Sequence, residues 1–301
     1  MRLQTLIQFT SMKIIDGKAI AEKIKNEIKA EVAAIIDRDE RAPHLAAILV
    51  GNDPASETYV ASKDRNCKAL GITSSLYKLD SKTTEEELLK VIHFINNDPD
   101  IDGLIVQQPL PSHINPDKVI EAISPAKDVD GFHPLNVGKM AIGLPTFLPA
   151  TPMGIVEMIR REGIETEGKH VVVLGRSNIV GTPIAMMLSR KGKPGNATVT
   201  LCHSKTENLK ELCLQADILI AAIGKPGFVT ASMVKPGAVV IDVGIHRISD
   251  NSEKGYHIAG DVDFAEVSKI ASAITPVPGG VGLMTIAALI MNTMKAFKKE
   301  L

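Results

Sequence analysis

The stretch from His170 to Pro183, HVVVLGRSNIVGTP, predicts a buried strand that leads through a glycine turn into a helix. A strand, a glycine turn and a helix in this order usually begin a dinucleotide-binding site. The glycine spacing is unusual, because Gly175 and Gly181 bracket Arg-Ser-Asn-Ile-Val instead of following G-x-G-x-x-G. A cation and a hydroxyl therefore stand where a second glycine would let the backbone approach a pyrophosphate.

Strand-like runs alternate with amphipathic helical stretches on both sides of this unit. The runs are LAAILV, DGLIVQ, HVVVLG, ATVTLC, ADILIAAIG and AVVIDVG. Their alternation with helices predicts an α/β fold with parallel sheets. The stretch beginning near Lys18 predicts a helix that packs one face on a sheet, because its apolar residues recur at helical spacing: Ile20, Ile24, Ile28, Val32 and Ile35.

A long irregular segment, SPAKDVDGFHPLNVGKMAIGLPTFLPATP, separates the two halves of the chain. It is rich in glycine and proline and long for a loop inside a compact domain, so it predicts a domain junction rather than a helix or strand. Thr151 can cap the next helix with Pro152 in its first position, and the second domain is expected to begin there. A last apolar helix, from about Leu283 to Phe297, could return to the first domain.

The length of 301 residues and the composition predict a globular protein of about two domains, and we expect its ligand to be a small molecule. With 34 basic and 35 acidic residues and no basic block, it offers no electrostatic footprint for nucleic acid. No apolar run approaches the roughly 18 residues of a membrane span, and Met1 to Ser11 is interpreted as an extension rather than a signal peptide. Three cysteines without metal-site spacing predict no metal and a reducing compartment, the cytosol: Cys67, Cys202 and Cys213.

The region around the glycine turn favours NADP over NAD. Ser177 and Asn178 are expected at a helix N-terminus, where free backbone N–H groups can bind phosphate. The strand ATVTLC is followed by HSKT, where an NAD site usually carries an acidic residue for the ribose hydroxyls. Arg176 and Ser204 can instead bind a 2′-phosphate. The alternative is that both are ordinary turn residues that face solvent.

The first half of the chain offers candidates for proton chemistry. GNDPASETYVASKDRNCKALG predicts a helix opened by Asp53-Pro54 and closed before Gly71. Tyr59 and Lys63 then lie on one helical face, with Ser56 one turn earlier. A lysine in a suitable environment can act as a general acid or base. The alternative is a solvated lysine whose stem is covered by the tyrosine.

Three further segments carry polar or glycine-rich loops. Gln107 and Gln108 end the DGLIVQ strand, at the carboxyl edge where open α/β sheets bind ligands. Asp128 and Asp130 lie in KDVDGFHP, where simple turn formation is the alternative. The glycines of TPVPGGVGLMT permit either close backbone approach to a flat ligand or a tight structural turn.

Seven segments in order carry a resemblance to a known family: PASETYVASK, GLIVQQPLP, KDVDGFHPLNVGK, TPMGI, VVVLGRSNIVGTP, ATVTLCHSKT and ITPVPGGVGLMT. From about Lys13 to the last helix, the chain resembles the bifunctional methylenetetrahydrofolate dehydrogenase/methenyltetrahydrofolate cyclohydrolase family. The resemblance implies NADP-dependent oxidation of 5,10-methylenetetrahydrofolate to the 5,10-methenyl compound, followed by hydrolysis to 10-formyltetrahydrofolate. It also implies a homodimer.

The resemblance implies a role for individual residues. Lys63 is the implied catalytic lysine, Tyr59 stacks on the folate ring, Gln107 bonds the lysine and Asp130 binds the pterin. The expected substrate site comprises Tyr59, Lys63, Val106, Gln107, Gln108, Asp130, Pro278, Gly279 and Gly280. The expected cofactor site comprises Gly175, Arg176, Ser177, Ser204 and Ile245.

The resemblance also implies how the two domains are built. The last helix rejoins the first domain, so residues 1–150 with 283–301 form an N-terminal α/β catalytic domain. Residues 151–282 form a Rossmann-like NADP-binding domain, with a cleft between the two domains.

Two positions depart from the family pattern, and two other functions stay open. Ala150 stands where the family has a cysteine, which puts a thiol role in doubt, and Leu283 replaces a proline, which can loosen the turn before the last helix. One alternative function is a two-domain NADP dehydrogenase of another small substrate, for which a base such as Lys63 would be indispensable to hydride transfer. The other is a folate-binding protein without turnover.

Overall fold

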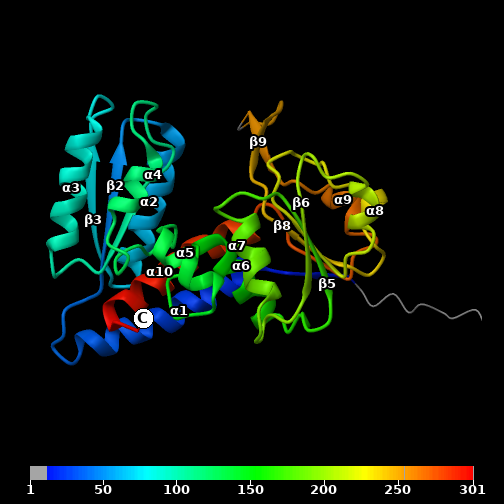
Figure 1. The fold of residues 1–301 in the computed structure, drawn as a ribbon, viewed down its shortest axis with the longest axis horizontal. Helices are drawn as coiled ribbons and strands as arrows, with labels where there is room; N and C mark the ends of the chain where they lie inside the picture. Colours follow the sequence, from blue (N-terminus) through cyan, green and yellow to red (C-terminus); the bar gives the residue numbers. More distant parts are fainter. Residues whose placement is uncertain (1–11, 254, 301) are drawn as a thin grey trace, which may run out of the picture. The chain divides into compact units, whose positions relative to one another are not determined.

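The computed structural model describes residues 12–253 and 255–300, which form two compact units (Figure 1). The three-stranded unit comprises Ala19–Gly154 with residues 284–300, and the six-stranded unit comprises residues 12–18 with Ile155–Leu283. The chain passes from one unit to the other inside three helices: α1 (Gly17–Ile36), α6 (Ala150–Arg161) and α10 (Val281–Lys298). The extension predicted at Met1 to Ser11 lies outside the described residues.

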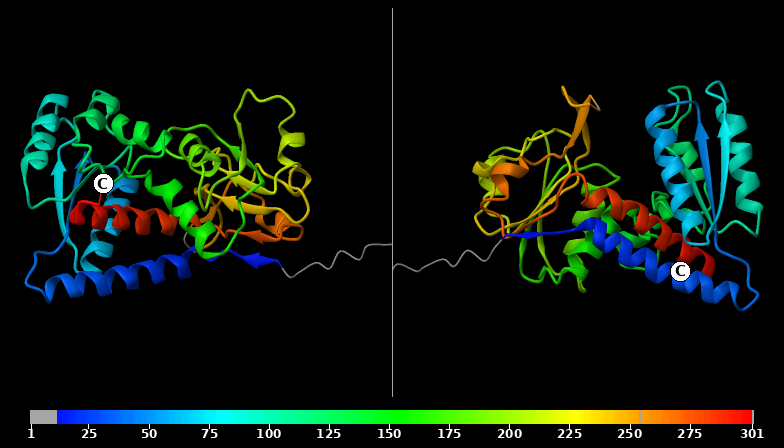
Figure 2. Two further views of the ribbon diagram at one scale, coloured as in Figure 1. Left: turned by 60° about the horizontal axis from the view of Figure 1, so that its bottom comes forward. Right: turned by 180° about the vertical axis from the view of Figure 1, so that it is seen from behind.

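The three-stranded unit is built on a parallel sheet in the order β3-β2-β4. Its strands are β2 (His44–Val50), β3 (Thr73–Leu79) and β4 (Gly103–Val106). The helices α2 (Pro54–Ala69) and α3 (Glu85–Asn97) lie on opposite faces of the sheet (Figures 1 and 2). Both faces are thus covered, which explains why β2 is apolar at nearly every position and buried from Leu45 to Val50. The short helix α4 (Pro116–Ala122) adds Val119 to the core shared with α3.

The last helix is apolar because much of it is buried. By length and composition alone, α10 is long and apolar enough to cross a membrane. The sequence analysis expected no apolar segment of that length, and α10 corrects this expectation. Met284, Ala287 and Leu289 are fully buried, however. Asn292 donates hydrogen bonds from Nδ2 to the carbonyls of Val129 (2.8 Å) and Leu148 (2.9 Å), which ties the helix into the three-stranded unit.

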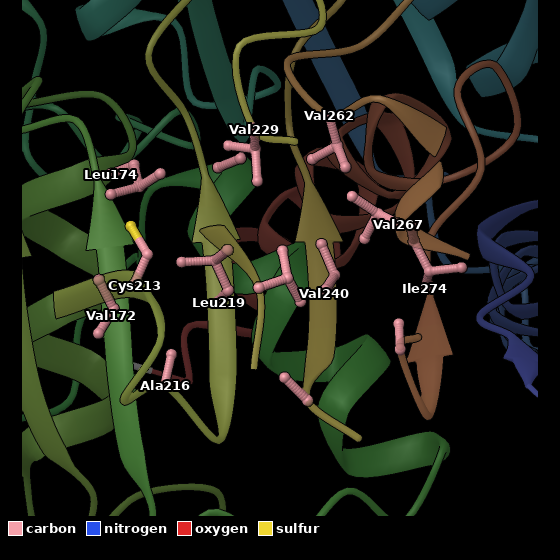
Figure 3. Packing of buried hydrophobic residues seen from close by; sticks show 14 of the residues in the cluster. Val172, Leu174, Cys213, Ala216, Leu219, Val229, Val240, Val262, Val267 and Ile274 are labelled. Atoms are coloured by element: carbon pink, nitrogen blue, oxygen red, sulfur yellow. The ribbon is translucent and has the colours of Figure 1, made fainter. Parts of the chain in front are cut away.

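The six-stranded unit carries a parallel sheet in the order β1-β11-β8-β7-β5-β6. Its strands are β1 (Lys13–Ile14), β5 (His170–Leu174), β6 (Thr198–Cys202), β7 (Ile218–Ala221), β8 (Val239–Asp242) and β11 (Ala273–Ile274). Figure 3 shows one buried face of the sheet, where Val172, Leu219 and Val240 project from neighbouring strands. The pairing of β1 with β11 was not expected, because the sequence analysis placed residues before 150 in the first domain.

Shorter elements complete the six-stranded unit. The helices are α7 (Gly181–Ser189), α8 (Leu209–Cys213) and α9 (Phe264–Val267), with a single 3₁₀ turn at Ala231–Met233. An antiparallel hairpin pairs β9 (His246–Ser249) with β10 (Tyr256–Ala259).

Two local expectations are corrected by the structure. The segment expected to be irregular contains the helix α5 (Pro134–Ala141), which has proline in its first turn and is capped by His133, whose Nδ1 accepts from Leu135 N at 3.0 Å. Helix α6 begins at Ala150, so Thr151 lies inside its first turn rather than capping it. The buried stripe of α1 is confirmed, since its five predicted apolar residues expose 7% or less.

The glycines of the dinucleotide-type turn are required by packing. A Cβ on Gly181 would lie 1.8 Å from the carbonyl oxygen of Gly175, and a Cβ on Gly175, whose φ is +109°, would lie 2.1 Å from the carbonyl oxygen of Ala222. Real Cβ atoms do not approach backbone atoms so closely, so helix α7 can meet the turn only through glycine.

We expect Gly181→Ala to lower the free energy of unfolding by about 3 kcal/mol or more, because the clash is with backbone that cannot move aside. Urea unfolding would measure the loss. Gly138→Ala is the control: Gly138 lies in α5 with no atom within 4 Å of its Cβ position, and alanine favours a helix over glycine by about 1 kcal/mol. Equal stability of the two variants would contradict the packing argument.

Candidate functional site

Helix α2 carries the tyrosine and lysine singled out by the sequence. Asp53 caps it as predicted, accepting a hydrogen bond from Ser56 N at 2.8 Å, and the helix ends at Ala69 before Gly71. Tyr59 and Lys63 therefore lie one turn apart on the same helical face. Tyr59 is 49% exposed, and Lys63 is half-buried.

The end of strand β4 supplies the partner of the lysine. The backbone N–H of Gln107 donates to the Ile48 carbonyl at 2.9 Å, which fixes this residue to the sheet just after the buried Val106. Lys63 Nζ donates to Gln107 Oε1 at 3.2 Å, while Gln107 Nε2 donates to the Gln108 carbonyl at 2.6 Å. Because both ends of the amide are engaged, its oxygen is directed at the amine. Gln108 contributes through its main-chain carbonyl.

The two aspartates of KDVDGFHP have different roles. Asp128 is buried, and its carboxylate accepts hydrogen bonds from three successive backbone N–H groups, those of Gly131, Phe132 and His133, and from Asn136 Nδ2. Burial raises the pKa of Asp128 to about 6, although these donors oppose the rise. Asp128 therefore fixes the loop, which is the turn-forming role that the sequence offered as the alternative.

Asp130 lies in a different environment from Asp128. Burial raises the pKa of its carboxyl above the ordinary value, and the nearby Lys63 ammonium lowers it in part, so the two charges lie within electrostatic reach of each other. No donor among the described residues bonds the Asp130 carboxylate. Lys63, Gln107, Tyr59 and Asp130 thus come from one helix, one strand end and one loop of the same unit.

The six-stranded unit has a pocket at the glycine turn. It is lined by Leu174, Gly175, Arg176, Ser177, Cys202, His203, Ser204, Leu209, Ala222, Ile223, Lys225 and Phe228. Arg176 and Ser204 are both exposed and belong to the same pocket, as a shared 2′-phosphate site requires. No aspartate or glutamate lines it, and Lys225, which the sequence analysis did not single out, adds a second cation.

The turn differs from expectation in where the helix starts. Ser177 and Asn178 were expected at a helix N-terminus, but α7 begins at Gly181 with Val180 as its N-cap. The Ser177 hydroxyl accepts a hydrogen bond from Val180 N at 3.1 Å, so it stabilises the turn that precedes the helix. After this turn, Gly181 packs directly against Gly175.

The remaining predicted residues lie in the six-stranded unit. Ile245 follows β8 and is 47% exposed. Pro278, Gly279 and Gly280 form a turn that requires its glycines: Gly279 has a φ of +111°, and a Cβ on Gly280 would lie 2.6 Å from the Pro276 carbonyl oxygen. A place for these three residues in the substrate site stays a prediction. Among the described residues, no cluster of His, Cys, Asp or Glu could hold a metal ion.

The parallel sheet, the glycine turn and the adjoining pocket define a dinucleotide-binding α/β protein. Comparison with known families identifies it further. Residues 15–130 match the sequence model described as "Tetrahydrofolate dehydrogenase/cyclohydrolase, catalytic domain", and residues 149–301 match that of its NAD(P)-binding domain. The chain therefore belongs to the tetrahydrofolate dehydrogenase/cyclohydrolase family.

Individual relatives agree with this membership. Bifunctional protein FolD of Porphyromonas gingivalis is 57% identical over 290 residues, covering 96% of this chain and 98% of that protein. The structure of the bifunctional enzyme FolD, methylenetetrahydrofolate dehydrogenase/cyclohydrolase, from Campylobacter jejuni superposes with a TM-score of 0.90 at 48% identity, covering 96% and 100% of the two chains. The Trypanosoma brucei enzyme, solved with NADP and an inhibitor, gives a TM-score of 0.90 at 37% identity, covering 97% and 99%.

The buried Asp128 carboxyl should make stability depend on pH. Its pKa in the folded chain, about 6, lies above the ordinary 3.8, so the folded state holds this proton more tightly than the unfolded state. The resulting contribution to stability is full below about pH 4 and is lost as the pH rises through about 6. Each unit of pKa difference corresponds to about 1.4 kcal/mol, which gives a change of roughly 3 kcal/mol.

Urea unfolding of the wild type and of Asp128→Asn between pH 4.5 and 7.5 would measure this contribution. The wild type should lose stability relative to the variant as the pH rises, because the amide does not titrate. Asp242, whose pKa burial also raises to about 6, is present in both proteins and cancels in the difference. A difference in unfolding free energy that stays constant with pH would contradict the prediction.

Proposed function

We propose that the chain oxidises 5,10-methylenetetrahydrofolate with NADP and hydrolyses the 5,10-methenyl product to 10-formyltetrahydrofolate, using the residues described above. The observation that carries the proposal is the hydrogen bond from Lys63 Nζ to Gln107 Oε1, made beside Tyr59 and Asp130 in a chain of this family. These four residues are the catalytic set, and Val106 and Gln108 complete the strand end that holds them.

The oxidation requires positioning rather than acid or base catalysis. NADP supplies the hydride acceptor, and the methylene carbon that bridges N5 and N10 loses hydride to become a methenyl cation, so no proton is transferred. Tyr59 presents an exposed ring on which the folate can stack. Asp130 can accept paired hydrogen bonds from the guanidine-like edge of the pterin. Both contacts hold the reacting carbon in place.

The hydrolysis requires proton transfers, which we assign to Lys63. Water adds to the methenyl carbon and loses one proton, which leaves a hydroxyl on that carbon. The bond from the carbon to N5 then breaks as N5 gains a proton, and the hydroxyl releases its own proton to solvent as the formyl C=O forms on N10. An amine can accept the first proton and donate the second. Gln107 holds the amine through its amide oxygen, whose direction is fixed by the hydrogen bond from Nε2 to Gln108.

The pocket at the glycine turn is suited to NADP. Arg176 and Ser204 would hold the 2′-phosphate, and an acidic residue that would repel this phosphate is missing from the pocket lining. Gly175, Ser177 and Ile245 would complete the cofactor site, and Pro278 to Gly280 would contribute to the folate site.

We further propose, from the family resemblance, that the protein is a homodimer. Three buried cysteines with free thiols support a cytoplasmic location.

Lys63→Met separates the two activities. Methionine keeps much of the apolar stem and removes the amine, so hydrolysis of the methenyl compound should fall by about 10²–10⁴-fold. Oxidation should survive in part and methenyltetrahydrofolate should accumulate. Both rates are measured on one preparation, with reduced cofactor and methenyl absorbance followed together.

Lys68→Met is the matched control for this experiment. Lys68 lies on the same helix but is solvent-exposed and paired with Asp64, so both activities should persist in that variant. Hydrolysis near the wild-type rate in Lys63→Met would show that Lys63 is a solvated helix residue. Loss of oxidation by the same factor as hydrolysis would favour a dehydrogenase that needs a base.

Arg176→Ala tests cofactor choice. The guanidinium can bond the 2′-phosphate that NADP has and NAD lacks, and a charge-assisted hydrogen bond is worth about 1.5–3 kcal/mol. The KM for NADP should therefore rise roughly ten- to a hundredfold while that for NAD changes little. Cofactor-free hydrolysis of the methenyl compound should be unaffected in the same preparation. Equal losses for both cofactors would contradict the assignment.

A further inference from the structure

The buried carboxylate of Asp261 accepts hydrogen bonds from the loop that follows β7, beside the pocket at the glycine turn. Asp261 is fully buried and does not line the pocket. Its Oδ2 accepts from Ile223 N (2.7 Å) and Gly224 N (3.0 Å), and its Oδ1 accepts from Lys225 N at 2.8 Å. Three successive backbone N–H groups thus converge on one side chain, 36 to 38 residues away in sequence.

The same carboxylate holds a second segment. His246 Nε2 lies 2.7 Å from Asp261 Oδ1 and is positioned to donate to it. His246 begins strand β9 and directly follows Ile245, one of the residues expected to contact the cofactor. Asp261 therefore links the segment after β7 to the segment after β8.

The position of Asp261 is itself fixed by another buried aspartate. The carboxylate of Asp242, at the end of β8, accepts from Asp261 N and Val262 N at 2.9 Å each, and from Gly244 N at 2.9 Å. A Cβ on Gly244 would lie 2.4 Å from Asp261 N, so the two segments are in direct contact. The carboxylate that receives the loop is thus anchored to the sheet.

The loop held by Asp261 forms a wall of the pocket. Ile223 and Lys225 line it together with Arg176 and Ser204. The preceding residue, Ala222, places its carbonyl oxygen where a Cβ on Gly175 would stand 2.1 Å away, so the loop also abuts the glycine turn. Movement of this loop would change the shape of the pocket without altering Arg176 or Ser204.

We propose that Asp261 is a positioning residue for the cofactor, and that His246 is its partner in this role. The proposal rests on the proposed function only in taking this pocket as the NADP site. Asp261 shapes the wall and does not line the pocket, so its loss weakens the binding of NAD as well as that of NADP. This distinguishes it from Arg176, whose loss affects NADP alone.

The test is Asp261→Asn in the full-length protein. An amide has one acceptor oxygen, and its NH2 group would face two of the donors that now bind the carboxylate. The KM values for NADP and for NAD should both rise roughly tenfold or more. Hydrolysis of methenyltetrahydrofolate, measured without cofactor, should keep its wild-type kcat and KM. NADP binding measured by calorimetry should weaken by the same factor as the KM.

A pair of substitutions at His246 tests the proposal even if Asp261→Asn fails to fold. His246→Gln keeps an N–H donor within reach of Asp261 and should retain near-wild-type KM values for both cofactors, whereas His246→Leu removes the donor and should raise both. His257→Leu is the matched control, since His257 bonds Asp250 at 2.8 Å on the exposed hairpin and not at the pocket.

Several results would overturn the proposal. One is an unchanged KM for both cofactors in folded Asp261→Asn or His246→Leu. Another is a rise in KM for NADP but not for NAD. A third is a fall in cofactor-free hydrolysis as large as the loss with the cofactors, which would indicate general damage to the protein. Failure of the proposed function itself would look different, because the wild type would then show neither NADP-dependent oxidation nor hydrolysis.

Discussion

Buried aspartates that accept successive backbone N–H groups fix the loops at the carboxyl ends of both sheets. In the three-stranded unit, Asp128 receives three such groups from the residues that follow Asp130. In the six-stranded unit, Asp261 receives three from the loop after β7, and Asp242 receives three around the end of β8. An ionised acceptor makes stronger hydrogen bonds than a neutral one, which offsets part of the cost of burying the charge. At Asp128 and Asp242 the remaining cost still raises the pKa to about 6. Loops that would otherwise move are thereby held in one conformation.

This construction separates the residues that hold a site from those that face the ligand. The Asp128 carboxylate accepts hydrogen bonds from the backbone. Among the described residues, no donor bonds the carboxylate of Asp130, two residues later. In the same way Asp261 holds the loop whose members, Ile223 and Lys225, line the pocket. Preorganised groups need not be ordered when the ligand binds, so less binding energy is lost to loop entropy.

Local signals in the sequence predicted the parts of the structure that depend on neighbouring residues. The Asp53 cap and the proline after it located the start of α2, and helical spacing then placed Tyr59 beside Lys63. The contact between Lys63 and Gln107 joins residues 44 positions apart, and it was anticipated only through the family resemblance.

Asp261 and its loop were missed altogether, because an aspartate in GDVDF carries no local sign of partners far away in the chain. Helix α5 was missed because glycine and proline outweighed a two-turn amphipathic pattern; the proline sits in the first turn, where a helix tolerates it.

The two reactions can share one folate position because they make different demands on the same residues. Hydride loss creates a cation at the bridging carbon and transfers no proton, so in the proposed mechanism Lys63 takes no part in this step. Hydrolysis follows at that same carbon and needs the proton transfers that Lys63 can perform. If Asp130 holds the pterin and Tyr59 the ring, as we propose, the carbon does not have to move between the two steps. The cofactor is needed only for the first step, and the pocket that we assign to it is lined entirely by residues of the six-stranded unit.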